Sequence, residues 1–239
     1  MMISAVLSNP NHPDYGVVTI PFPIPHDQYA HCMELLEALE VGDAVKADCK
    51  LEEVDSFFSV LKHTEMLTVN VEELNYLAKR LDSFDTGEAA QFQAMAHKLE
   101  LFELKDLINL TFCCQQATVI TDFSDLAAIG RDHYMNLHGG CASVDELNAL
   151  DGEETARQLI ENGSGTITPY GVVYDNGMKL EQFYQGREFP CYYYEPNPLT
   201  VAVTSKNEPE GTEHIISNEA PDPQSAGVRE IRYHAGCRA

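Results

Sequence analysis

The sequence is poor in basic residues. It has 15 Lys and Arg against 38 Asp and Glu, which gives a formal net charge of −23. The few basic residues form no cluster, and a surface this acidic repels phosphate groups. We therefore expect that the protein does not bind nucleic acid.

The sequence also lacks the features of exported and membrane proteins. It has no run of about 18 apolar residues, the length that indicates a membrane-spanning helix. Its first residues, MMISAVLSNPNHPDYG, have neither the basic start nor the apolar stretch of a signal peptide. Seven cysteines at irregular spacing do not indicate a disulfide framework. We expect reduced thiols, a cytoplasmic location and no membrane partner.

Motifs for catalysis are missing as well. The chain contains no GxSxG, P-loop or GxGxxG sequence. The adjacent Cys113 and Cys114 follow an apolar segment, which favours burial over reactivity. We expect no catalytic residues, no cofactor, no metal and no enzyme activity. Four residues within ten positions could ligate a metal, although their spacing matches no zinc motif: Asp132, His133, His138 and Cys141. An alternative is a hydrolase or metal enzyme built around the first three of them.

What is present is enough apolar sequence for a core, since 44% of the residues are hydrophobic. The pattern predicts an α+β fold, arranged as an elongated multi-domain chain. A small N-terminal α/β domain is expected at 1–68, a helical middle domain at 69–116 and a C-terminal α/β domain at 117–205. Residues 206–239 form a polar, proline-containing tail or linker. Residues 1–205 carry 32 acidic and 11 basic residues, so the acidity belongs to the expected folded part.

Within these domains, β-rich and helix-like segments can be assigned by periodicity. Strands are expected at 3–8, 16–24, 44–51, 57–62, 117–121, 165–175 and 189–205. Pro21 and Pro23 confine the second strand to a sheet edge. Helices are expected at 26–39, 71–84, 87–101, 103–112, 123–137, 143–150 and 153–162. Four of them have a capping residue at their start: Asn70, Asp85, Ser143 and Asp151.

Acidic residues recur along the predicted helices at a spacing comparable to that of DNA charges. Duplex DNA carries about one negative charge per 1.7 Å of axis, and a helix rises about 1.5 Å per residue. Carboxylates lining one face would therefore approximate a phosphate track, although acidic helices also simply favour solubility. The candidate DNA-mimic surface consists of Glu72, Glu73, Asp82, Asp85, Glu88, Glu100, Glu103, Asp106, Asp122, Asp125, Asp132, Asp145, Glu146, Asp151, Glu153, Glu154 and Glu161.

Several stretches resemble the ArdA antirestriction proteins of mobile genetic elements, in the version found in Firmicutes. The similar stretches are SNPNHPDYGVVTIPFPIP, VNVEELNYLAKRLDSF, ELKDLINLTFCCQQATVITDFSDLAAIGRDHYMN and TPYGVVYDNGMKLEQFYQGREFPCYYYEP. The resemblance covers most of residues 2–205 and rests on extent and order rather than on a catalytic signature. Region 139–190 is more glycine-interrupted than the compact C-terminal domain of better-known members, and the sequence after Ser205 does not resemble the family.

The resemblance implies a function without turnover. ArdA proteins are elongated, acidic homodimers that occupy the DNA-binding groove of type I restriction-modification enzymes and compete with DNA for the methyltransferase core. They thereby protect incoming plasmid or transposon DNA. An alternative from the residues is an acidic protein–protein interaction module of a conjugative element without antirestriction activity, anchored by aromatic residues such as Tyr192, Tyr193 and Tyr194.

Overall fold

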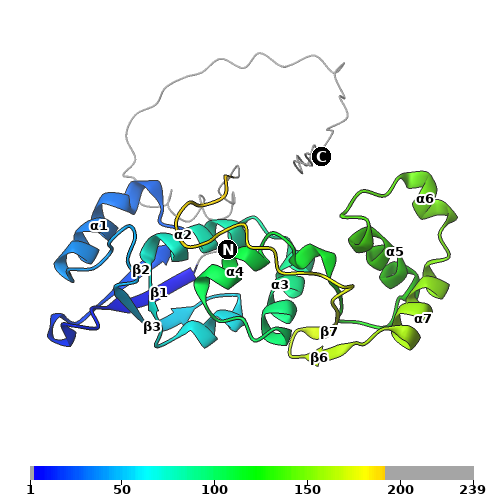
Figure 1. Cartoon of the computed structure of the whole chain (residues 1–239), viewed down its shortest axis with the longest axis horizontal. Helices are drawn as coiled ribbons and strands as arrows, with labels where there is room; N and C mark the ends of the chain where they lie inside the picture. The colour runs from blue at the N-terminus through cyan, green and yellow to red at the C-terminus, as the bar shows by residue number, and fades with distance from the viewer. Residues whose placement is uncertain (1–2, 192–239) are drawn as a thin grey trace, which may run out of the picture. The chain divides into compact units, whose positions relative to one another are not determined.

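The computed structural model describes residues 3–191, which have an α+β architecture, as expected (Figure 1). In this range no helix is both long and apolar enough to cross a membrane. The predicted final strand beyond residue 191, the tyrosines at 192–194 and the polar tail lie outside the described residues.

The N-terminal part of the chain forms a four-stranded antiparallel sheet with the order β2-β1-β3-β4. As predicted, the strand that contains Pro21 lies at an edge of the sheet, where a missing N–H does not interrupt the ladder. The elements are β1 (Ile3–Ser8), β2 (Val17–Phe22), α1 (Tyr29–Ala38), β3 (Cys49–Asp55) and β4 (Thr68–Val69). Short 3₁₀ helices at Pro13–Tyr15 and His26–Gln28 flank β2.

The strand predicted at 57–62 is wrong. Residues Ser59–Thr64 form the 3₁₀ helix η3 instead. Val60 and Leu61 are adjacent and both buried, which breaks the alternation of a strand, and Leu61 and Thr64 lie one 3₁₀ turn apart. The strand predicted at 44–51 exists but begins only at Cys49.

Three helices follow, and the first two have the predicted caps. The Asn70 side chain accepts from the Glu73 N–H, and Asp85 and Glu88 form a reciprocal capping box. The apolar residues on one side of the first helix are buried: Val71, Leu74, Leu77, Ala78 and Leu81. Leu99 is 39% exposed, because the second helix ends one residue before it. The helices are α2 (Val71–Asp82), α3 (Thr86–Lys98) and α4 (Leu104–Leu110).

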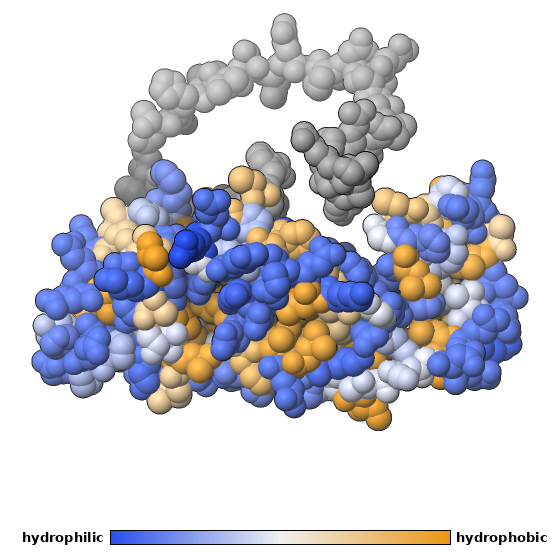
Figure 2. Space-filling model, in the orientation of Figure 1, coloured by the Kyte–Doolittle hydropathy of each residue, from blue (hydrophilic) through white to orange (hydrophobic). Residues whose placement is uncertain are grey.

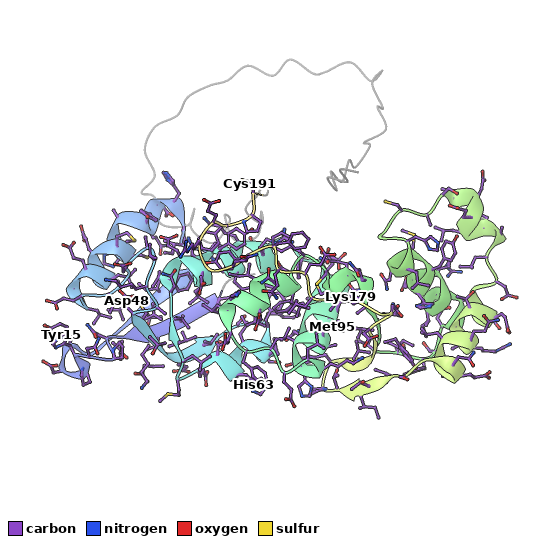
Figure 3. All side chains as sticks on the ribbon, in the orientation of Figure 1. Tyr15, Asp48, His63, Met95, Lys179 and Cys191 are labelled. Carbon is purple, nitrogen blue, oxygen red and sulfur yellow. The ribbon has the colours of Figure 1, made fainter. Side chains whose placement is uncertain are left out.

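A single buried apolar cluster combines the first sheet with these three helices. It extends from Ile3 to Ala117 along the chain and also includes Val173 and Tyr184. Met95, labelled in Figure 3, is 1% exposed within it. The sheet and the helical segment therefore bury their apolar faces against one another.

A second, smaller apolar cluster lies beneath the remaining helices. Its buried members are Ile120, Ile129, Ala156, Leu159 and Tyr174. The sheet there has the antiparallel order β5-β7-β6. The elements are the 3₁₀ helix η4 (Cys114–Gln116), β5 (Thr118–Ile120), α5 (Leu126–Leu137), α6 (Val144–Ala149), α7 (Gly152–Asn162), β6 (Thr166–Thr168) and β7 (Gly171–Tyr174).

Residues 178–191, called the strap below, have no regular secondary structure and return along α2 and α4 (yellow to orange in Figure 1). The buried Asn109 side chain holds the strap by two hydrogen bonds: it accepts from the Tyr184 N–H at 2.7 Å and donates to the Tyr184 carbonyl at 2.9 Å. The Phe189 ring stacks between Tyr76 and Tyr184. Cys191, labelled in Figure 3, is the last described residue.

Candidate functional site

The predicted acidic surface is largely exposed. Twelve of its seventeen side chains belong to exposed residues: Asp85, Glu100, Glu103, Asp122, Asp125, Asp132, Asp145, Glu146, Asp151, Glu153, Glu154 and Glu161. Four more belong to partly exposed residues: Glu72, Glu73, Glu88 and Asp106. Hydrophilic residues dominate the face shown in Figure 2, with an apolar area near its middle.

Asp82 does not belong to this surface. It is only 4% exposed at the end of α2. The sequence pattern could not separate it from its neighbours, because an Asp in the last turn of an amphipathic helix is usually solvated. Asp82 is therefore removed from the candidate surface as a correction.

Several of the exposed carboxylates also begin helices. The side chains of Asp85, Asp125 and Asp151 each accept the backbone N–H of the third helical residue, at 2.8 to 3.1 Å. Capping of this kind stabilises the helix start and fixes the carboxylate in one place. Glu146 accepts from both the backbone and the hydroxyl of Ser143, and these bonds lower the pKa of its carboxyl. These charges therefore have fixed positions while they stay open to solvent.

Other carboxylates of the surface bind neighbouring side chains. Glu73 accepts from the Tyr184 hydroxyl at 2.9 Å, and Glu153 pairs with Arg157 at 3.2 Å. Asp122 accepts from the Ser124 N–H and hydroxyl, which lowers the pKa of the Asp122 carboxyl. Of the candidate surface residues, all within the described range, seven make no hydrogen bond or ion pair and are free to meet an external cation: Glu72, Glu100, Glu103, Asp106, Asp132, Asp145 and Glu161.

The sequence reasoning missed an acidic face in the N-terminal part. Glu34 and Glu37 on α1 and Glu40 just beyond its end recur every third residue and are exposed. An open hollow of about 640 Å³ beside the end of α1 is lined in part by Glu37 and Glu40 together with two carboxylates of the following loop. One of these is Asp48, labelled in Figure 3, which accepts from the backbone N–H groups of Gly42 and Asp43. The three-residue spacing in α1 was the signal that would have revealed this face.

Much of the positive charge is used inside the chain. Arg80 donates to the hydroxyl and carbonyl of Thr111 and lies 4.3 Å from the centre of the Phe112 ring. Lys98 is bonded to Asp175 at 2.6 Å, and this contact lowers the pKa of the Asp175 carboxyl. Three further cations pair with carboxylates on the same chain: Lys46, Lys50 and Arg157. These five are nearly half of the eleven Lys and Arg in the described range, and eleven cations are too few to neutralise its 31 Asp and Glu.

The alternative metal site is not assembled. Across residues 3–191, no three His, Cys, Asp or Glu side chains converge in a way that could hold a metal ion. His133 bonds to Thr118, whereas His138 bonds to the Tyr134 carbonyl one turn earlier. Asp132 and Cys141 are exposed.

The two adjacent cysteines are buried, as predicted. Cys113 is 2% exposed and Cys114 is fully buried. Burial raises the pKa of both thiols, which keeps them protonated and unreactive at neutral pH. Neither residue is available as a nucleophile.

Comparison with known proteins adds no family assignment. Neither a scan of protein-family models nor a search of curated proteins gives a match to this chain.

Proposed function

We propose that this protein is an antirestriction DNA mimic of the ArdA type, without enzyme activity, that occupies the DNA-binding groove of type I restriction-modification enzymes. The observation that supports the proposal is the exposed carboxylates of α2 to α7, several of them fixed by helix caps, beside cations already paired within the chain. Such a surface offers a basic groove a set of charges with defined positions. Binding would release counterions and exclude DNA.

The proposal includes the arrangement implied by the resemblance. The protein would act as a homodimer in which N-terminal, middle and C-terminal domains follow one another along an elongated molecule. It would act in the cytoplasm, where restriction enzymes meet incoming DNA. Its partner is the methyltransferase core of the restriction enzyme, and the protein uses no cofactor.

The direct test is competition for a type I methyltransferase complex. Labelled cognate DNA is bound to the purified enzyme, the protein is added, and release of DNA is measured at about 0.05 M and 0.2 M salt. The proposal expects displacement that weakens steeply with salt, because exposed charges separated by more than the Debye length of about 10 Å at 0.1 M are screened. No displacement from several such enzymes by the folded protein would contradict it.

The contribution of charge can be separated from that of capping. Asp85→Asn, Asp125→Asn and Asp151→Asn together remove three charges and keep the caps, since Asn caps as well as Asp does. We expect an unchanged unfolding free energy and weaker competition.

Single neutralisations should weaken competition only mildly, whereas neutralising the acidic residues at 122–132 and 145–161 as blocks should weaken it severely. Complete loss of competition after one conservative substitution in a folded protein would contradict a distributed mimic.

The same experiment addresses the alternative interaction module. An acidic protein that binds another partner through apolar or aromatic anchors would not displace DNA from the methyltransferase. Its binding to that partner would also persist at raised salt, because burial of apolar surface does not depend on charge screening.

A further inference from the structure

Polar side chains from α5 and from the turn after β7 converge on the Thr118 hydroxyl, which belongs to β5. Its Oγ1 lies 2.9 Å from the His133 Nδ1 and 3.3 Å from the Asn136 Nδ2, both on α5. It also lies 2.9 Å from the Asn176 Nδ2 in the turn after β7. Gln91 of α3 joins the group through Asn136. Thr118 is 3% exposed. Buried polar groups are normally hydrogen-bonded, so the Thr118 hydroxyl hydrogen is expected to have an acceptor among these side chains.

Two backbone carbonyls fix the orientations of the amide groups. Carbonyl oxygens only accept, so the Gln91 NH₂ must face the Ala117 oxygen at 2.7 Å and the Asn176 NH₂ must face the Gln116 oxygen at 2.8 Å. The same Gln91 NH₂ donates to the Asn136 Oδ1 at 3.3 Å. The Asn136 NH₂ is thereby turned toward Thr118.

The Thr118 oxygen consequently accepts two hydrogen bonds, one from Asn136 and one from Asn176. A hydroxyl has two lone pairs and one hydrogen. With both lone pairs occupied, the Thr118 hydroxyl can only donate toward His133, and the His133 Nδ1 must accept.

We infer that His133 is held as the neutral tautomer with its proton on Nε2, and that its Nδ1 is the acceptor that docks α5 onto β5, so that protonation of this ring loosens α5. A proton on Nδ1 would face an oxygen with no free lone pair. The inference does not depend on the proposed function.

The surroundings of His133 offer no charge to stabilise an imidazolium. Its neighbours on α5 are Arg131 and Asp132, both exposed. Among the described residues packed around it, β5 contributes a hydroxyl, α3 an amide and the turn after β7 an amide. Asp175 in that turn is already paired with Lys98. The charged groups of α7, which packs on α5, are exposed: Glu153, Glu154, Arg157 and Glu161.

Burial lowers the pKa of His133 below its ordinary value, which agrees with this geometry. The unfolded chain then binds a proton at a higher pH than the folded chain does. Stability is therefore full at neutral pH and falls as the pH drops below about 6.5. Each unit by which the folded pKa lies below that value favours unfolding by up to tenfold at low pH.

The first test is nuclear magnetic resonance on the unaltered protein with ¹⁵N-labelled histidine. At pH 7.5 we expect the Nδ1 of His133 to show the shift of an unprotonated nitrogen and Nε2 that of a protonated one. On acidification the ring should titrate below about 6.5, together with faster amide exchange in α5. A proton on Nδ1 at neutral pH, or an ordinary or raised pKa, would overturn the inference.

A variant provides the second test. His133→Asn keeps an acceptor at the position of Nδ1 but does not titrate. We expect its urea unfolding to lose less stability between pH 7.5 and 5.5 than that of the unaltered protein. The matched control is His138→Asn, since His138 is exposed directly after α5, stacks on Tyr134 and bonds to the Tyr134 carbonyl, with no bond to β5. This control should keep the original pH dependence, and an equal pH dependence in all three proteins would count against the inference.

Discussion

At the residue scale, Gly130 sets how closely α5 and α7 approach. A Cβ placed there would lie 1.9 Å from the backbone oxygen of Gly152, which is far inside van der Waals contact. We expect Gly130→Ala to destabilise the protein by about 3 kcal/mol, since overpacking against backbone cannot relax cheaply. The matched control is Gly87→Ala in the first turn of α3, where the added Cβ meets only the Asp85 carboxylate at 3.3 Å. Urea denaturation should place the control at or above the original stability, and equal effects of both changes would refute the packing argument.

Residue roles were predictable when their cause is local. The caps at Asn70, Asp85, Ser143 and Asp151 were predicted correctly because a cap needs only the three residues that follow it. The role of Gly130 depends on a helix that begins 22 residues later, so its neighbours in sequence gave no signal. The burial of Asp82 was missed for the same reason.

At the element scale, one buried side chain takes the place of a strand partner for the backbone of the strap. Asn109 is fully buried and satisfies both the N–H and the carbonyl of Tyr184. We expect Asn109→Ala to cost about 2 to 4 kcal/mol, because it leaves two backbone groups without partners. Limited proteolysis should then cut within residues 178–191 faster than in the unaltered protein. Asn148→Ala, an exposed change on α6, is the control and should leave the cleavage pattern unchanged.

Helices and strands could be predicted where their apolar residues recur at a regular spacing. The helices with a regular apolar face were found, as was the first hairpin with its edge strand. The 3₁₀ helix η3 was mistaken for a strand because Phe57, Phe58, Val60 and Leu61 form a short apolar run in the sequence. The strap has no regular spacing of apolar residues, and Asn109, which binds Tyr184 of the strap, lies 75 residues before it along the chain. The exposed acidic helices could be predicted as a candidate surface, whereas the acidic face of α1 was missed.

At the scale of the whole molecule, the net charge of −23 opposes folding and favours association with cations. Added salt should therefore act on the two processes with opposite signs. Raising sodium chloride from about 0.05 to 0.5 M should increase the free energy of unfolding in urea, because it screens repulsion among the surface carboxylates. The same change should weaken competition with DNA for the methyltransferase. Tetramethylammonium chloride is the control for specific sodium binding and should give the same two trends. If both salts instead lowered the free energy of unfolding, attractive ion pairs would dominate among the surface carboxylates. An acidic surface neutralised in that way could not imitate a phosphate track.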